Sequence, residues 1–261
     1  MQPVFDENIL ACAQRLEQGD PVRFRAVMAA PAHLRPRLFT LFAFNIEVAR
    51  APWVTSEEMI AEMRLQWWYD ALGEIAASAD IRRHEIVTPL SEQLTPAQAQ
   101  ELQRLVEARR WDIYRDPFES EDAFEKYIHA TSGTLLRVAG AAEDAATQAR
   151  LSELGYANGV ANFLVAVPEL VARGRTPFAV ETDRVFESAV SKALAACDRA
   201  LATRSEFPEM ARYAALSTYQ TQYILKCAAR SPNAVTQGAL QPSWLSDRLV
   251  LMKQRLLKPF R

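Results

Sequence analysis

The chain has 261 residues, of which 49% are hydrophobic, and this is enough for one large domain with a substantial core. Its 30 basic and 32 acidic residues are interspersed and give a net charge of −2, so the chain lacks the basic surface that is typical of nucleic-acid binding. Cys12, Cys197 and Cys227 form no Cys-x-x-Cys motif, which disfavours a disulfide framework or a zinc site. We expect a single domain over residues 1–261 in a reducing, cytoplasmic compartment, without a nucleic-acid partner.

The sequence also bears on membrane contact. The N-terminus has Asp6 and Glu7 where a secretory signal would have a basic and then an apolar stretch. No stretch approaches the roughly 20 uncharged apolar residues that are needed to span a bilayer. We therefore expect no membrane-spanning helix, and the sequence leaves contact with a membrane surface open.

Helices are predicted along the whole chain, because glycine is rare and apolar residues mostly recur at intervals of three and four. Thr55 with Glu58 fits a capping box, and Thr95 followed by Pro96 fits a capped helix start. Pro52 marks a stop. In the first half we predict helices over residues 6–19, 21–30, 36–50, 55–77 and 96–115, with a weaker helix or loop, interrupted by Pro89, over 80–95.

The second half of the chain shows the same pattern. Ser120 is a predicted helix cap, and a long apolar helix starts near Asp144. Pro232 and Gly238 mark a loop at 231–242 before the terminal helix. Besides the helix that starts near residue 144, we predict helices over 120–139, 183–204, 208–229 and 243–257.

Two rows of side chains run along the predicted helix 55–77, each with one residue every four positions. One row is polar and the other is apolar. We interpret the polar row as a solvated face and the apolar row as the opposite, core-facing side. The rows are Glu62, Gln66, Asp70 and Glu74, and Met59, Met63, Trp67 and Ala71.

Asn162, Ala166 and Leu170 share one face of a helix, because they lie four residues apart. The segment 155–178 around them resembles the second metal-binding helix of the squalene/phytoene synthase family, which runs Gly-x-Ala…Asn-Ile-Leu-Arg-Asp…Glu-Asp…Gly-Arg. In that family the asparagine and two aspartates hold magnesium against a prenyl diphosphate. Here the asparagine remains, and both aspartate positions are apolar.

The first metal motif of the family is altered as well. Residues 24–44, which end in Leu41-Phe-Ala-Phe44, resemble the part of these synthases that leads into Asp-Asp-x-x-Asp. The resemblance aligns those aspartates with Ala49, Arg50 and Trp53. All three carboxylates are therefore missing, and the proline between Arg50 and Trp53 is expected to break the helix at that point.

Residues 127–133, Tyr-Ile-His-Ala-Thr-Ser-Gly, resemble a further segment of the family, so the resemblance spans roughly residues 20–178. It implies an all-α fold, a single helical bundle of the isoprenoid-synthase type with a central apolar cavity. Ionising a prenyl diphosphate requires cations, and magnesium binds mainly carboxylate and phosphate oxygens. Because the family's carboxylates are missing, we assign no catalytic residue, no metal ligand and no cofactor.

The segment 63–72, Met-Arg-Leu-Gln-Trp-Trp-x-Asp-Ala-Leu, resembles the signature of a branch that lacks the aspartates and includes a mitochondrial assembly factor of respiratory complex I. The resemblance implies a non-catalytic role in complex I assembly, with complex I subunits or assembly intermediates as partners, or binding of an isoprenoid, lipid or protein at the inner membrane. One alternative is a prenyltransferase that condenses farnesyl or geranylgeranyl diphosphate on magnesium held by unusual ligands. Another is a helical carrier of a hydrophobic ligand.

Six polar residues are candidates for a cavity or ligand site. Buried amides need hydrogen-bond partners, so asparagines in apolar helices either bond between helices or line a cavity. Arginines beside a helix end either hold a phosphate or headgroup or stabilise the helix terminus itself. The candidates are Asn45, Arg50, Asn158, Asn162, Arg173 and Arg175.

Asp112 and Asp116 form an Asp-x-x-x-Asp pair at helical spacing. One interpretation is a relocated metal site. The other is the polar end of an exposed helix, in which Arg109, Arg110 and Arg115 neutralise the acids. We favour the second interpretation, because the arginines are close in sequence and no second acidic row is predicted to face the pair.

Overall fold

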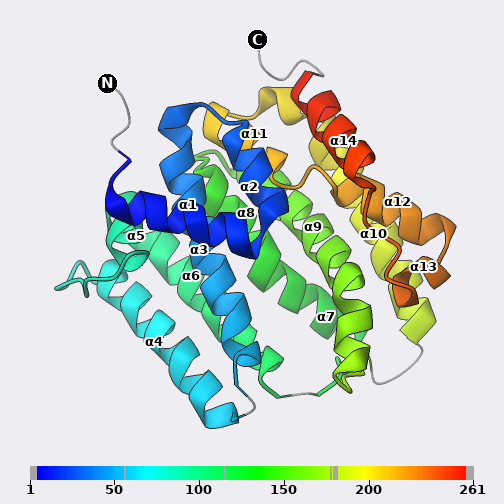
Figure 1. The fold of residues 1–261 in the computed structure, drawn as a ribbon, viewed down its shortest axis with the longest axis horizontal. Helices are drawn as coiled ribbons and strands as arrows, with labels where there is room; N and C mark the ends of the chain where they lie inside the picture. Colours follow the sequence, from blue (N-terminus) through cyan, green and yellow to red (C-terminus); the bar gives the residue numbers. More distant parts are fainter. Residues whose placement is uncertain (1–4, 56, 115, 177, 179–181, 257–261) are drawn as a thin grey trace. The chain divides into compact units, whose positions relative to one another are not determined.

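The structure is a computed structural model, and it describes residues 5–55, 57–114, 116–176, 178 and 182–256. The chain divides into two compact units, Met1–Tyr114 and Arg115–Arg261, each of which is described by itself. The described residues form helices and turns without a named β-strand, and an isolated bridge joins Phe118 and Phe178. The predicted all-α fold is confirmed (Figure 1).

The first unit contains α1 (Glu7–Gly19), α2 (Pro21–Met28), α3 (Arg35–Arg50), α4 (Glu58–Ala76), α5 (Val87–Gln93) and α6 (Pro96–Arg109). Helix α3 is buried on nearly every side, as its apolar sequence predicts, and α1, α2 and α5 pack against it. Asp6 caps α1 by accepting a hydrogen bond from the backbone N of Ile9 at 2.8 Å. The unit is therefore organised around the helix that leads to the altered first metal motif.

Helix α6 lies along α4 (Figure 1). Thr95 caps α6, and Gln98 completes a capping box by accepting a hydrogen bond from the backbone N of Thr95. The predicted proline at the first helical position is also confirmed. The helix ends at Arg109 and not near residue 115, because a 3₁₀ turn over Arg110–Asp112 replaces the last predicted turn.

Two helix starts in this unit differ from the prediction. The Thr55 hydroxyl accepts a hydrogen bond from the backbone N of Glu57, only two residues on, so Thr55 does not cap α4, which starts at Glu58. Pro89 does not interrupt α5, because it lies in the first turn, where its missing N–H removes no intrahelical hydrogen bond. Both differences concern local hydrogen bonds rather than the order of the helices.

The second unit contains α7 (Glu121–Ile128), a π-helical segment (His129–Gly133), α8 (Thr134–Gly140), α9 (Ala145–Ala172), α10 (Thr182–Ala202), α11 (Glu209–Leu216), α12 (Thr221–Arg230), α13 (Asn233–Thr236) and α14 (Trp244–Leu256). Helix α9 is central, and α8, α10, α12 and the π-helical segment pack against it. Helix α9 starts next to Asp144, as predicted, and Asp144 caps it by accepting a hydrogen bond from the backbone N of Thr147 at 2.7 Å. The segment 231–242 contains the one-turn helix α13 and leads into α14.

The predicted helix 208–229 is two helices, and this prediction was wrong. Helices α11 and α12 are separated by a turn over residues 217–220. The hydroxyls of Ser217 and Thr218 donate to the carbonyls of Ala214 and Ala215, three residues back, at 2.6 and 2.8 Å. Side chains that bond to the preceding turn compete with helix continuation, which explains the break.

Helix α9 is long and apolar enough to cross a membrane by length and composition alone, which the sequence analysis did not anticipate. In its apolar 18-residue stretch, 56% of the residues are buried inside the structure. A mostly buried apolar helix is typical of the core of a folded domain. We therefore interpret α9 as the core helix of the second unit.

Candidate functional site

The first altered metal motif lies at the end of α3. The helix ends at Arg50, and a 3₁₀ turn over Ala51–Trp53 follows, with Pro52 buried inside it. The predicted break at Pro52 is confirmed. Arg50 is exposed and Ala49 is half-buried, so the helix end offers a cation and a methyl group where the family has carboxylates.

The second altered motif lies on α9. Asn162 and Ala166 are exposed and Leu170 is half-buried, so the predicted stripe forms one continuous face. The nearby acid Glu169 accepts a hydrogen bond from Arg173 at 2.7 Å. Among the residues that the structure describes, no three His, Cys, Asp or Glu side chains come close enough together to hold a metal ion.

The asparagine candidates have different surroundings. Asn158 is 7% exposed, and its side-chain oxygen accepts a hydrogen bond from the Thr221 hydroxyl on α12 at 3.1 Å. This is the interhelical bond that was one of the two alternatives for a buried amide. Asn162, one turn further along α9, is exposed, and Asn45 is buried within α3 of the first unit at 8% exposure.

Arg173 and Arg175 do not form a two-armed clamp. Arg173 is exposed and forms an ion pair with Glu169, whereas Arg175 is 9% exposed. Gly174 has a φ of 73°, and the backbone N of Gly174 and of Arg175 bond to the carbonyls of Val171 and Leu170 at 2.9 Å each. This is a Schellman motif, so the Gly-Arg pair closes the helix.

The apolar row predicted as the core face of α4 is mostly at the surface, and this prediction was wrong. Met59 is 76% exposed, Met63 66% and Trp67 36%, whereas Ala71 is buried. Position 62 follows position 59 by three residues, so the polar and apolar rows lie only about 60° apart and share one side of the helix. The buried face consists of Ala61, Leu65, Trp68, Leu72 and Ile75.

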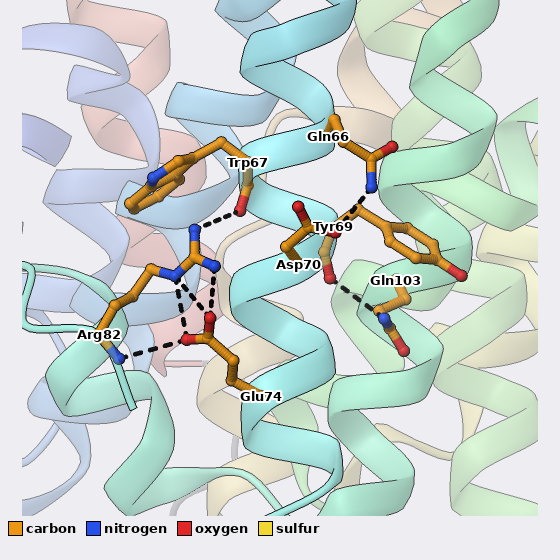
Figure 2. A network of polar contacts seen from close by, with 7 residues as sticks. All are labelled: Gln66, Trp67, Tyr69, Asp70, Glu74, Arg82 and Gln103. Atoms are coloured by element: carbon orange, nitrogen blue, oxygen red, sulfur yellow. Dashed lines mark hydrogen bonds and ion pairs between the residues drawn. The ribbon is translucent and has the colours of Figure 1, made fainter. Parts of the chain in front are cut away.

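A polar network surrounds the middle of α4 (Figure 2). The guanidinium of Arg82 donates to both carboxylate oxygens of Glu74 and to the backbone carbonyl of Trp67, and it lies 5.0 Å from the Trp67 ring. These hydrogen bonds lower the pKa of the Glu74 carboxyl. Gln66 donates to Asp70 at 2.7 Å. The polar row is therefore held by partners and is not simply solvated.

The two tryptophans of the 63–72 signature have different roles. Trp68 is 6% exposed and packs edge-on against Phe44 of α3, with ring centroids 5.4 Å apart. Trp67 faces outward, and both indoles contact His84 at centroid distances of 5.1 and 5.5 Å. Burial lowers the pKa of His84, and its Nδ1 accepts a hydrogen bond from the backbone N of Ile86. Of the two tryptophans in the signature, Trp68 therefore packs in the core and Trp67 lies at the surface.

Asp112 is paired, as expected, because Arg109 donates to it at 3.1 Å. The predicted exposure of this helix end was wrong for Asp112, which is 5% exposed, whereas Asp116 is exposed. An acid that is neutralised by an arginine and enclosed by protein is not available as a metal ligand.

A pocket of about 520 Å³ in the second unit was not anticipated from the sequence. Three of its lining residues, Arg204, Lys226 and Lys253, are cations, and none of the described lining residues is acidic. The cations come from three separate places in the chain, so sequence spacing carried no signal for them. The other lining residues are Leu201, Ser205, Tyr219, Gln222, Tyr223, Val250 and Gln254.

The described residues form a helical fold of the isoprenoid-synthase type, in which α3 and α9 take the places of the two metal-binding helices without their carboxylates. The sequence model of the squalene/phytoene synthase family matches residues 16–205. The chain belongs to the squalene/phytoene synthase family.

Curated relatives include complex I assembly factor 6 of several animals. The Drosophila melanogaster homolog is 30% identical over 181 residues, which cover 64% of this chain and 52% of that protein. The Mus musculus protein is 27% identical over 176 residues, which cover 64% of this chain and 51% of that protein. The chain therefore spans about half the length of the curated relatives that it matches.

Solved structures with the same fold cover nearly the whole chain. A dehydrosqualene synthase matches with a TM-score of 0.77 at 14% identity, covering 97% of this chain and 98% of that one. A squalene synthase of Alicyclobacillus acidocaldarius matches with a TM-score of 0.68 at 19% identity, covering 88% and 94%. At this level of identity the likeness shows the fold, which is that of the isoprenoid synthases.

Proposed function

We propose that this protein is a non-catalytic member of its family that acts in the assembly of respiratory complex I. The proposal rests on the side chains at the positions that align with the family's metal ligands. These positions hold Ala49, Arg50 and Trp53 in the first motif and Ala166 and Leu170 in the second. The similarity to complex I assembly factor 6 supports the same role.

The chemistry of prenyl transfer explains why these substitutions matter. A leaving diphosphate carries several negative charges, and magnesium stabilises it only when protein carboxylates hold the metal in place. Alanine, tryptophan and leucine offer no oxygen ligand, and the guanidinium of Arg50 would repel a cation. We therefore propose that the protein uses no metal cofactor and catalyses no condensation.

We assign contact with a complex I subunit or assembly intermediate to the exposed side of α4. Met59 and Met63 are the most exposed residues of its apolar row, and methionine adapts well to a partner's surface. Glu57, Glu58 and Asp70 are exposed beside them. This combination suits a partner segment that carries apolar side chains with lysine or arginine around them. The protein would act at the surface of the inner membrane, where complex I is built.

Binding of an isoprenoid or lipid is a second candidate function, and one buried group favours it. Tyr156 on α9 is 4% exposed, and its hydroxyl has no hydrogen-bond partner among the described residues. Burial raises the pKa of this phenol to about 12, so it stays a neutral donor. A ligand oxygen would satisfy it. Native mass spectrometry of the purified protein tests this, and a protein without added mass would contradict it.

The assembly role is tested by deleting the gene and measuring complex I by native gel and by NADH oxidation. Loss of complex I that the wild-type gene restores supports the proposal, and an unchanged level overturns it. The double substitution Met59→Asp with Met63→Asp should restore little. Met28→Asp is the matched control, because Met28 is 44% exposed on α2 of the same unit, and it should restore fully.

The absence of catalysis is tested separately. The purified protein is incubated with farnesyl or geranylgeranyl diphosphate and Mg²⁺ or Mn²⁺, and released pyrophosphate and hydrocarbon are measured. Turnover above a heat-inactivated sample would overturn the non-catalytic proposal. This result would not decide the role in complex I assembly, which the gene deletion tests independently.

A further inference from the structure

The outward side of α14 is an exposed apolar face. Leu245 is 59% exposed, Leu249 50% and Met252 51%. These positions follow one another at intervals of four and three residues, so they lie on one side of the helix. Trp244, at the start of the helix, is 71% exposed. Large apolar side chains at this exposure, gathered on one helix face, indicate a surface that binds a protein or a membrane.

Cations flank this apolar face on both sides. Arg248 and Arg255 lie along one edge and Lys253 along the other, by helical geometry, and all three are exposed. The Arg248 guanidinium lies 5.1 Å from the Trp244 ring. The acid of this segment, Asp247, is only 6% exposed, so it does not offset the cations at the surface.

The inward side of α14 is held firmly by the second unit. Asp247 accepts a hydrogen bond from the Tyr219 hydroxyl at 2.5 Å and another from Gln220. Gln254 accepts from the half-buried Arg204 at 3.0 Å and donates to the backbone carbonyl of Tyr219 at 2.9 Å. The helix is therefore fixed with its apolar face outward, and the exposure does not come from a detached terminus.

The cationic edge extends beyond α14. Lys253 shares the 520 Å³ pocket with Lys226 and Tyr223 of α12, both of which are exposed. Ammonium groups and a phenol hydroxyl in an open pocket are donors for phosphate oxygens. A phosphate-bearing surface that meets the apolar face of α14 would reach these groups at the same time.

We propose that the outward face of α14, formed by Leu245, Leu249 and Met252 and extended by the exposed Trp244 at the helix start, docks on a bilayer that contains anionic phospholipids. An apolar helix face with tryptophan at one end and cations on both edges is the pattern of helices that lie in the membrane interface. The long cationic side chains reach the headgroup phosphates while the apolar side chains enter the acyl boundary. The exposed apolar row of α4 has the acids Glu57, Glu58 and Asp70 beside it as well as the cation Arg64, so it should attract an anionic surface less than α14 does.

This inference names the surface that would hold the protein at the membrane. It rests on the proposed function only for that membrane location. Docking does not depend on complex I, because a ligand carrier or an enzyme could use the same helix face. Vesicle binding and complex I level are therefore measured separately. Loss of one with the other intact shows which proposal has failed.

The test is flotation of the full chain with vesicles of phosphatidylcholine alone or with added phosphatidylglycerol. Binding should require phosphatidylglycerol and weaken at high salt. Lys253→Glu should weaken binding by roughly 25-fold, since each charge near the surface contributes roughly a fivefold change and reversal counts twice. Leu249→Ser with Met252→Ser should weaken it at least about tenfold. Lys253→Arg, which keeps the charge, should bind like the wild type.

Met59→Asp with Met63→Asp is the matched control, because it alters an exposed apolar row of similar size on α4, and it should leave vesicle binding unchanged. Circular dichroism and the melting temperature of every variant exclude misfolding. Equal binding to both kinds of vesicle, no binding at all, or equal loss in the α4 control would overturn the proposal. So would light scattering that shows a stable dimer which Leu249→Ser separates, since a second copy would then cover the face.

Discussion

At the scale of single residues, the Asn158–Thr221 hydrogen bond joins α9 to α12 inside the second unit. Thr221 is 2% exposed and Asn158 is 7% exposed. Thr221→Val keeps the shape of the side chain but removes the donor, which leaves a buried amide oxygen unsatisfied. We expect a loss of about 1–2 kcal/mol in the free energy of unfolding, measured by urea denaturation. Thr221→Ser keeps the hydroxyl and should cost less; equal losses would contradict the hydrogen-bond account.

His84 gives the first unit a dependence on pH. Burial lowers the folded-state pKa of its imidazole below the ordinary value of 6.5, so the unfolded chain binds the proton more readily. Protonation would also remove the acceptor that bonds to the backbone N of Ile86. The stabilisation is therefore fully present above pH 6.5 and is lost as the pH falls through the interval between the unfolded and folded pKa values.

We expect the free energy of unfolding to fall less between pH 8 and pH 5 in His84→Gln than in the wild type. Urea denaturation at the two pH values measures the difference. His129 is unchanged in both proteins, so its own burial-lowered pKa cancels from the comparison. An identical pH dependence in the two proteins would show that His84 does not contribute to the pH dependence of stability.

At the scale of helices, α9 crosses the π-helical segment at very short range. A Cβ placed on Gly155 would lie 2.6 Å from the backbone oxygen of Ser132 and 2.8 Å from the Cα of Gly133. Backbone atoms cannot move aside as a side chain can, so Gly155→Ala should destabilise the protein by roughly 1–3 kcal/mol. Thermal unfolding measures this, with Ala166→Ser on the exposed side of α9 as the control. Unchanged stability in Gly155→Ala would show that the crossing is looser.

The helices were predictable where capping and apolar spacing agreed, and less so where side chains bonded locally. Thr95 and Ser120 cap the helices for which they were predicted. Ser217 and Thr218 split a predicted helix, because hydroxyls that bond to the preceding turn leave no trace in apolar spacing. The spacing of apolar residues also does not indicate the π-helical segment His129–Gly133.

The candidate site was predictable where single residues decided the chemistry. The break at Pro52 and the missing carboxylates can be read from the sequence alone. The exposed side of α4 was misassigned, because two adjacent rows were taken as opposite ones. The pocket with Arg204, Lys226 and Lys253 depends on how α12 and α14 pack, which sequence spacing does not contain.

At the scale of the whole molecule, the single domain over residues 1–261 remains a prediction that calorimetry can test. A single domain should unfold in one cooperative transition, with calorimetric and van't Hoff enthalpies equal within error. Two transitions, or a calorimetric enthalpy well above the van't Hoff value, would mean that Met1–Tyr114 and Arg115–Arg261 unfold separately. The same scan on Thr221→Val would identify the transition that belongs to the second unit.

The Schellman closure at Gly174 has a consequence for how such chains are recognised. The glycine–arginine pair occurs in the family's second motif, yet here it ends a helix whose metal ligands have gone. A search pattern that rewards this pair therefore detects a turn that closes a helix, whether or not the acidic positions of the motif are kept. The acidic positions of the motif, where this chain has Ala166 and Leu170, are the ones that carry information about metal binding.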